Sequence, residues 1–211
     1  MPNALIVDDH PPLRMVLAMQ LRGIPGIGEI HEASTGQEAL EIMRKHAPDL
    51  VILDLDIPRI NGLDLIPRLR SANEGVRILV VSGQDINTFA ARVKQAGAQG
   101  FVSKLEDMPR IAKAMESVLA GYTIFPEAAV EAATSSSGRI TSDDELLRSL
   151  SDKELLVLQM LARGMTNKAV ADALYISNKT VSTHKTHIMQ KLRVGTMVEL
   201  VDFARRCHVA T

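Results

Sequence analysis

The stretch Leu50-Val51-Ile52-Leu53-Asp54 places four apolar residues directly before a carboxylate. A short run that is apolar at every position is typical of a strand buried on both faces of a parallel sheet. The same arrangement recurs in Leu5-Ile6-Val7-Asp8-Asp9, in Ile78-Leu79-Val80-Val81-Ser82 and in Gly100-Phe101-Val102-Ser103-Lys104. In an open parallel sheet the carboxyl ends of the strands form the ligand-binding edge. We therefore expect the polar residues that follow these runs to lie together at one site.

Short apolar runs alternate with helical patterns over residues 1–122. The runs expected to be strands are 4–7, 29–33, 50–53, 76–81 and 100–102. Helical periodicity follows each run, and Thr35 with Glu38 has the spacing of a capping box at the second helix. This alternation predicts an α/β domain with a doubly wound, parallel, five-stranded sheet, right-handed crossovers and helices on both faces.

The character of the sequence changes after residue 122. Residues 123–147 contain Thr134-Ser135-Ser136-Ser137-Gly138 and the acidic Asp143-Asp144-Glu145, a composition typical of a linker. Residues 148–211 are helical in pattern throughout, which predicts a small all-α domain of four short helices. The expected helix boundaries are marked by a Ser151/Glu154 capping box, by Gly164 after the first helix, by caps at Thr166 and Ser177, and by a last helix over Met197–Arg206.

The composition limits the classes of protein that this chain can represent. Apolar residues make up 46% of the chain and aromatic residues 3%, without Trp, so the core must be aliphatic. A single cysteine, Cys207, excludes an internal disulfide framework and any multi-cysteine metal site. No charged-then-apolar leader and no apolar run of membrane-spanning length is evident. We therefore expect a cytoplasmic protein without a membrane partner.

The small net charge of −1 hides an asymmetry along the chain. Residues 1–122 carry a net charge of −2 and residues 123–147 a net charge of −4, whereas residues 148–211 hold 10 basic and 5 acidic residues, a net charge of +5. A basic end on a near-neutral body favours a polyanion as partner of that end alone. An ordinary solvated surface is an alternative that charge alone leaves open.

The residues at the ends of the apolar runs have the chemistry needed for phosphoryl transfer to a carboxylate. Such a transfer needs a nucleophilic oxygen, a cation and donors for the other phosphoryl oxygens. We expect Asp54 to be the nucleophile, and Ser82 and Lys104 to contact the phosphoryl oxygens. The expected Mg²⁺ ligands are Asp8, Asp9, Asp54 and the backbone carbonyl of Asp56. Taken alone, Asp8-Asp9 is also compatible with a simple helix cap.

Residues 178–192 form a helical pattern with one apolar and one polar face. Val181, Ile188 and Leu192 share the apolar face, while Lys179, Lys185 and Lys191 supply positive charge. A short helix, a turn and such a polar helix are typical of a helix-turn-helix whose second helix enters the major groove of DNA. The alternative is a helical bundle that binds a protein partner.

The first domain resembles a known family. The residues that carry the resemblance are Asp8-Asp9-His10-Pro11, Asp54-Leu55-Asp56-Ile57-Pro58 with Asn61-Gly62, Ser82-Gly83, Gly97-Ala98 and Gly100-Phe101-Val102-Ser103-Lys104. They are similar to the receiver domain of bacterial response regulators, whose sheet is of the CheY or flavodoxin type. The resemblance implies that Asp54 takes a phosphoryl group from a histidine kinase, and that Ser82 and Phe101 form the switch. Asp56 is acidic where the family varies freely.

The second domain resembles the LuxR/FixJ-type DNA-binding domain. The matching residues include Leu150-Ser151, Glu154, the run from Leu161 to Lys168, Thr180-Val181, His184, Lys191-Leu192 and Glu199-Leu200. The resemblance implies that Ser182, Thr183 and Thr186 face bases, and that Met197, Val198 and Val201 belong to a dimer contact. The remaining residues expected at the DNA are Thr166, Asn167, Lys168, Lys179, Thr180, Val181, Lys185 and Lys191. Ala169 and Met197 depart from the residues common in the family.

Together the two domains identify the chain as similar to two-component response regulators of the NarL/FixJ subfamily, in its BvgA- and EvgA-like branch. This class implies a transcription regulator that binds promoter DNA as a homodimer, with phosphorylation favouring dimerisation or freeing the helix-turn-helix. A contact with RNA polymerase is compatible with the class. We expect no enzyme beyond self-phosphorylation and autodephosphorylation at Asp54. The alternatives are a haloacid-dehalogenase-type phosphatase using Asp54 and Asp56, a small-molecule sensor, and a regulator whose pocket does not respond to phosphate.

Overall fold

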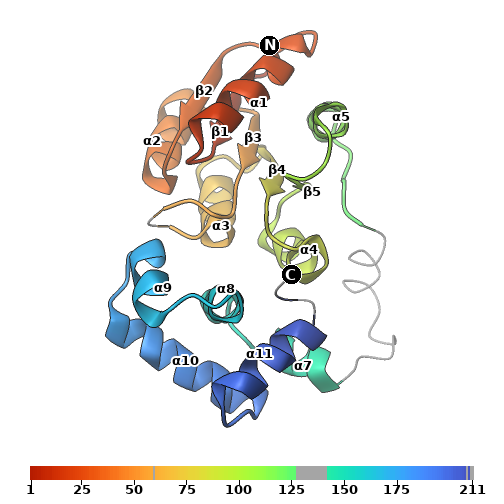
Figure 1. The fold of residues 1–211 in the computed structure, drawn as a ribbon. Coiled ribbons are helices and arrows are strands. Elements are labelled where there is room, and N and C mark those ends of the chain that lie inside the picture. Colours follow the sequence, from red (N-terminus) through yellow and green to blue (C-terminus); the bar gives the residue numbers. More distant parts are fainter. Residues whose placement is uncertain (59, 127–141, 208, 210–211) are drawn as a thin grey trace. The chain divides into compact units, whose positions relative to one another are not determined.

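The computed structural model describes residues 1–58, 60–126, 142–207 and 209 (Figure 1). The chain divides into two compact units, Met1–Thr134 and Ser135–Thr211, and each is considered by itself. No helix in the described part of the chain is both long enough and apolar enough to cross a membrane.

The first unit contains a sheet of five parallel strands in the order β2-β1-β3-β4-β5. The strands are β1 (Ala4–Val7), β2 (Ile30–Ala33), β3 (Leu50–Leu53), β4 (Arg77–Ser82) and β5 (Gly100–Ser103). Every residue of β1 and β3 is buried, because strands in the middle of such a sheet are covered on both faces. The predicted doubly wound parallel sheet is confirmed.

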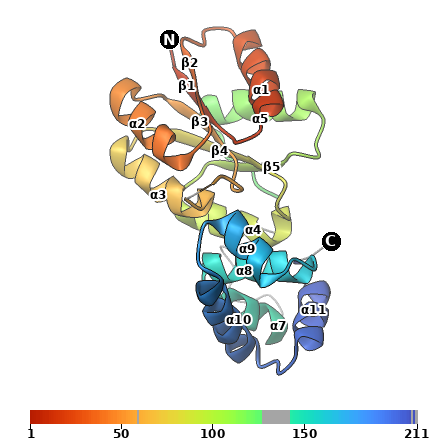
Figure 2. The same cartoon turned by 60° about the vertical axis from the view of Figure 1, so that its left-hand side comes forward.

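Five helices cover the two faces of this sheet. They are α1 (Pro11–Gly23), α2 (Gly36–His46), α3 (Gly62–Ala72), α4 (Ile86–Ala96) and α5 (Met108–Leu119). Figure 2 shows α1 and α5 on one face, where Leu17, Met115 and Val118 pack against Ile6 and Ile52 of the sheet. The helices α2, α3 and α4 lie side by side on the other face. The crossovers therefore deliver every strand end to a common edge.

The predicted capping box at α2 is only half formed. The Thr35 side chain accepts a hydrogen bond from the Glu38 amide, as expected of an N-cap. The Glu38 carboxylate does not return this bond to Thr35, and accepts instead from the Ser34 amide at 2.7 Å and the Ser34 hydroxyl at 2.9 Å. The prediction of a complete capping box was wrong, because Ser34 offers the Glu38 carboxylate both an amide and a hydroxyl donor.

The second unit is helical throughout its described residues. It contains α7 (Ser142–Arg148), α8 (Asp152–Ala162), α9 (Asn167–Leu174), α10 (Asn178–Leu192) and α11 (Met197–Arg206). The Ser151/Glu154 capping box is complete, Thr166 and Ser177 cap α9 and α10, and Gly164 adopts a φ of +83° after α8. Most of α7 lies in the segment predicted as a linker, and residues 127–141 of that segment lie outside the described residues.

Candidate functional site

The sheet brings the predicted acidic residues together at its carboxyl edge. Val7 and Leu53 are register partners, and the amide of Asp54 donates to the carbonyl of Val7 at 2.8 Å. On the other side, the amide of Lys104 donates to the carbonyl of Ser82 at 2.9 Å. The ends of four strands therefore hold Asp8, Asp54, Ser82 and Lys104 at one site, as the sequence predicted.

A lysine bridges two buried carboxylates at this site. Lys104 Nζ lies 2.7 Å from Asp8 Oδ2 and 2.7 Å from Asp54 Oδ2. The two aspartates are each 2% exposed. Burial acts to lower the pKa of the Lys104 ammonium, but the charges and hydrogen bonds of Asp54 and Asp8 outweigh it, so the pKa lies above its usual value. The ammonium therefore stays charged and offsets part of the charge of this carboxylate pair.

One oxygen of Asp54 is buried without compensation. Asp54 Oδ1 has no hydrogen-bond partner among the described residues. An unpaired buried acceptor costs about 1–3 kcal/mol, and more when it is charged. Carboxylate oxygens of Asp8, Asp9 and Asp54 lie within 4.8 Å of one another, in a cluster that also includes His10. The carboxylate oxygens of the three aspartates suit a hard cation such as Mg²⁺. A bound cation or hydrogen-bond donor would supply Asp54 Oδ1 with the partner that it lacks among the described residues.

His10 contacts both N-terminal aspartates. Its Nδ1 lies 2.7 Å from Asp9 Oδ1 and 3.2 Å from Asp8 Oδ1, and its amide donates to Asp8 Oδ1 at 2.8 Å. Mg²⁺ prefers oxygen ligands, so His10 orients the two carboxylates and is not itself a ligand in this account. The roles of Asp9 and of the Asp56 carbonyl as Mg²⁺ ligands stay predictions.

The two predicted switch residues are both inside the first unit. Ser82 is completely buried, and its hydroxyl accepts a long bond, 3.4 Å, from the Gln84 amide. Phe101 on β5 is 1% exposed. The ring therefore occupies the core, and the hydroxyl lies at the end of β4 beside the acidic edge.

Gln84 is a pocket residue that the sequence analysis missed. It is 3% exposed, and its side-chain amide donates to Asp56 Oδ1. The Gln84 carbonyl oxygen is buried and has no hydrogen-bond partner in the described part of the chain. No motif singled out this glutamine, because its partner lies 28 residues away in the sequence. The acidic side chain of Asp56 is thus tied to the loop that follows Ser82.

The helix α10 carries the residues predicted to read DNA. Ser182, Thr183 and Thr186 are exposed, and each hydroxyl donates to the carbonyl four residues earlier, at 3.0, 3.0 and 3.1 Å. These bonds fix the hydroxyl directions and leave oxygen lone pairs for an incoming donor. Lys179 is exposed and Lys185 is half-buried. One polar helical face thus presents both small hydroxyls and cations.

The residues around the start of α9 flank this face. Lys168 is exposed, and Thr166 uses its hydroxyl to accept from the Ala169 amide at 3.2 Å. The side-chain Nδ2 of Asn167 donates to Ser182 Oγ at 3.3 Å, and this bond joins α9 to α10. Thr180 is half-buried beside the Ser177 cap.

One predicted DNA residue is corrected by the structure. Val181 is completely buried in the second unit, so its side chain cannot touch DNA and instead anchors α10 from the core side. Lys191 is also engaged internally: its Nζ lies 2.6 Å from Glu154 Oε2 and 3.2 Å from the Ser149 carbonyl. Its expected contact with the DNA backbone would have to compete with this ion pair.

The predicted dimer contact lies on α11. Val198 is 70% exposed, whereas Met197 and Val201 are half-buried. Met197 and Val201 line a groove of about 470 Å³ together with Met165 and Lys185. An exposed valine beside an apolar groove is compatible with a subunit contact, and the dimer role stays a prediction.

The Glu154–Lys191 pair makes the second unit sensitive to acid. Burial raises the pKa of Glu154, but hydrogen bonds from Lys191 and Ser151 outweigh it, so the pKa lies below the usual 4.5. A depressed carboxyl pKa contributes stability above pH 4.5 that is lost as the pH falls through the folded-state value. We expect Glu154→Gln to lower the free energy of unfolding at pH 7 by about 1 kcal/mol, because Lys191 is partly exposed.

The measurement is hydrogen exchange of α8 and α10 in the full chain between pH 4 and pH 7. The difference between wild type and Glu154→Gln should shrink toward pH 4. Glu145→Gln, which changes an exposed acid on α7, is the matched control and should follow wild type throughout. If the exchange difference between wild type and Glu154→Gln stays constant from pH 4 to pH 7, the negative charge of Glu154 does not stabilise the second unit.

A parallel sheet with an acidic edge and a lysine, followed by a helix-turn-helix unit, defines a phosphoacceptor regulator that binds DNA. Residues 4–116 match the response regulator receiver domain, and residues 148–204 match the bacterial regulatory proteins of the luxR family. The chain therefore belongs to the response regulators with a LuxR-type DNA-binding domain.

Similar proteins cover the chain almost completely. BvgA of Bordetella pertussis is 43% identical over 210 residues, which is 99% of each chain. The DNA-binding transcriptional activator EvgA of Escherichia coli K12 is 36% identical over 204 residues, 97% of this chain and 98% of that one. RcsB of Salmonella enterica serovar Typhimurium, solved on promoter rprA with phosphomimetic BeF3-, superposes with a TM-score of 0.66 over 96% of this chain and 97% of that one. Its identity is 24%, so it supports the fold alone.

Proposed function

We propose that this chain is a transcription regulator whose Asp54 accepts a phosphoryl group from a histidine kinase and thereby controls promoter binding. The observation that carries the proposal is the buried Asp54 carboxylate. Its Oδ2 lies 2.7 Å from Lys104 Nζ, and its Oδ1 has no hydrogen-bond partner among the residues that the structure describes. This arrangement supplies a nucleophile and a cation already in contact. Its relatives named as transcription regulators support the DNA-directed role.

The pocket residues would divide the work as follows. Mg²⁺, held by Asp8, Asp9, Asp54 and the Asp56 carbonyl, would neutralise charge on the transferring group. An oxygen of Asp54 would attack phosphorus in line with the P–N bond of the donor phosphohistidine, which breaks and releases the imidazole of the kinase. Lys104 would hold a phosphoryl oxygen. The hydroxyl of Ser82 donates to another oxygen. The new dianion recruits this hydroxyl and the loop that bears it, and Phe101 transmits the change to the surface of the first unit.

The DNA-directed part of the proposal rests on the face of α10. Ser182, Thr183 and Thr186 would face bases, while Lys179 and Lys185 would meet phosphates. A dimer would present two such helices to two half-sites related by two-fold symmetry. The proposal also includes a contact of this regulator with RNA polymerase, and it places the regulator in the bacterial cytoplasm.

We also infer that the chain is not a turnover enzyme. Phosphoryl chemistry would be confined to transfer onto Asp54 and its hydrolysis. The phosphatase alternative would need a second acidic pair late in its domain, whereas Asp8-Asp9 comes first here. Hydrolysis of small phosphate esters at a steady rate would contradict this inference.

Phosphorylation is expected to increase self-association of the full chain. The measurement is sedimentation velocity with and without acetyl phosphate and Mg²⁺, with Val198→Glu as a second sample. Wild type should shift toward a dimer when phosphorylated, and Val198→Glu should shift less because it places a charge on an exposed apolar position of α11. If wild type stays monomeric while its DNA affinity rises, release of the helix-turn-helix replaces dimerisation as the mechanism.

A further inference from the structure

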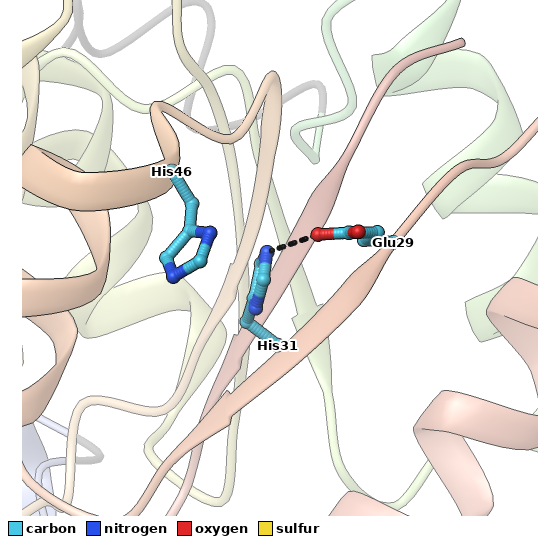
Figure 3. Close-up of side chains that lie close together, drawn as sticks. All are labelled: Glu29, His31 and His46. Atoms are coloured by element: carbon cyan, nitrogen blue, oxygen red, sulfur yellow. Dashed lines mark ion pairs between the residues drawn. The ribbon is translucent and has the colours of Figure 1, made fainter.

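Glu29, His31 and His46 form a cluster of metal-ligating side chains apart from the acidic pocket (Figure 3). One ligand atom from each lies within 4.8 Å of the others. Glu29 directly precedes β2 and His31 is the second residue of that strand, so the two are separated by the two-residue spacing that places side chains on the same face of extended chain. His46 is the last residue of α2. Figure 3 shows His31 between the other two side chains.

One ring nitrogen of His31 lacks a hydrogen-bond partner among the described residues. Its Nε2 is buried and has no hydrogen-bond partner among the described residues, although Glu29 Oε2 lies 3.5 Å away. The rings of His31 and His46 are 4.1 Å apart between centroids. Two imidazoles therefore lie in contact beside a carboxylate, and one buried ring nitrogen lacks a partner. In the tautomer that carries the proton on Nδ1, the lone pair of His31 Nε2 is free to bind a cation.

We propose that Glu29, His31 and His46 bind a divalent transition-metal ion, with Zn²⁺ as the representative. Two imidazoles and one carboxylate are a known zinc donor set, and water would complete a tetrahedral site. Imidazole also distinguishes this site from the all-oxygen pocket, because nitrogen donors favour zinc-class ions over Mg²⁺. Metal–ligand bonds of about 2 Å require the three donor atoms to approach by about 1 Å. Glu29, with a 73% exposed side chain, has the freedom to do so.

The electrostatics of the cluster agree with this assignment. Burial, and then the neighbouring His46 and Lys45, lower the pKa of His31, while Glu29 acts to raise it. The imidazole is therefore neutral at pH 7, which is the form that binds metal. The charge of Lys45 opposes the binding of an ion, and the carboxylate of Glu29 favours it.

The proposed site is separate from the phosphoacceptor pocket. His31 is in register with Leu5 near the beginning of β1, whereas Asp8 follows the end of that strand. An ion held here would join the edge strand β2 to the end of α2. The expected consequence is a more stable first unit, since a ligand that binds only the folded state raises the unfolding midpoint.

The test is calorimetric titration of the untagged full chain with Zn²⁺ in excess Mg²⁺, after treatment with a chelator. Wild type should bind one Zn²⁺, and its unfolding midpoint should rise. Glu29→Gln and His46→Gln should each weaken binding at least tenfold while keeping the metal-free midpoint. His187→Gln, at an exposed position of α10, and Asp54→Asn should both bind Zn²⁺ as wild type does. Unchanged affinity in Glu29→Gln and His46→Gln, or loss of binding in Asp54→Asn, would overturn the proposal.

Discussion

We expect Asp54→Asn to abolish the gain in DNA affinity that phosphorylation should give the wild-type chain. Asparagine keeps the shape of the side chain but has no carboxylate oxygen to attack phosphorus. Phosphorylation replaces the single charge of the Asp54 carboxylate with a phosphoryl group that carries up to two negative charges and three acceptor oxygens beside Lys104. A coupling of about 1–3 kcal/mol between two sites corresponds to a tightening of roughly 5–150-fold, which only wild type should show.

The measurement is fluorescence anisotropy on a duplex selected from random sequences by the phosphorylated chain. Each protein is titrated with and without acetyl phosphate and Mg²⁺. Asp64→Asn, a change of a half-buried carboxylate in the first turn of α3, is the matched control and should tighten as wild type does. Equal tightening in Asp54→Asn would place the phosphate effect elsewhere.

We expect Lys179→Ala and Thr183→Ala to weaken DNA binding in two different ways. Lys179 is exposed in the first turn of α10, so its loss should remove about one counterion per chain from the salt dependence and weaken all sequences alike. Thr183 is exposed one turn later and faces bases in this account. Its loss should cost about 1–3 kcal/mol per base contact on the selected site and leave non-specific binding unchanged.

Both variants are compared with Lys153→Ala, which removes an exposed lysine of α8 outside the proposed face. Titrations at several salt concentrations, on the selected duplex and on an unrelated one, separate the two effects. If Lys179→Ala and Lys153→Ala show the same affinity and salt dependence, Lys179 does not contact a DNA phosphate. A uniform loss in Thr183→Ala would reassign that residue to the backbone.

The strand ends could be predicted from sequence because each is fixed by a local pattern. An apolar run predicts a buried strand, and parallel topology then forces the residues after Val7, Leu53 and Val81 to one edge. The caps at Ser151, Thr166 and Ser177 are equally local. The polar face of α10 could also be predicted from the periodicity of its sequence. Val181 was predicted both to lie on the apolar face and to contact DNA, and its complete burial supports only the first prediction.

What escaped prediction depends on side chains distant in sequence. The hydrogen bond from Gln84 to Asp56 spans 28 residues and has no motif. The cluster of Glu29, His31 and His46 needs the end of α2 to return to the start of β2, which a strand-and-helix pattern does not specify. In each case the tertiary partner, and not the local propensity, sets the contact.

The most direct test is the intact mass of wild type and Asp54→Asn after exposure to acetyl phosphate and Mg²⁺. We expect the added mass of one phosphoryl group on wild type and none on Asp54→Asn. Omission of Mg²⁺ should leave both proteins unmodified, because the carboxylates around Asp54 then lack their cation. A phosphoryl group on Asp54→Asn, or none on wild type under any of these conditions, would contradict the assignment of Asp54 as the phosphoacceptor.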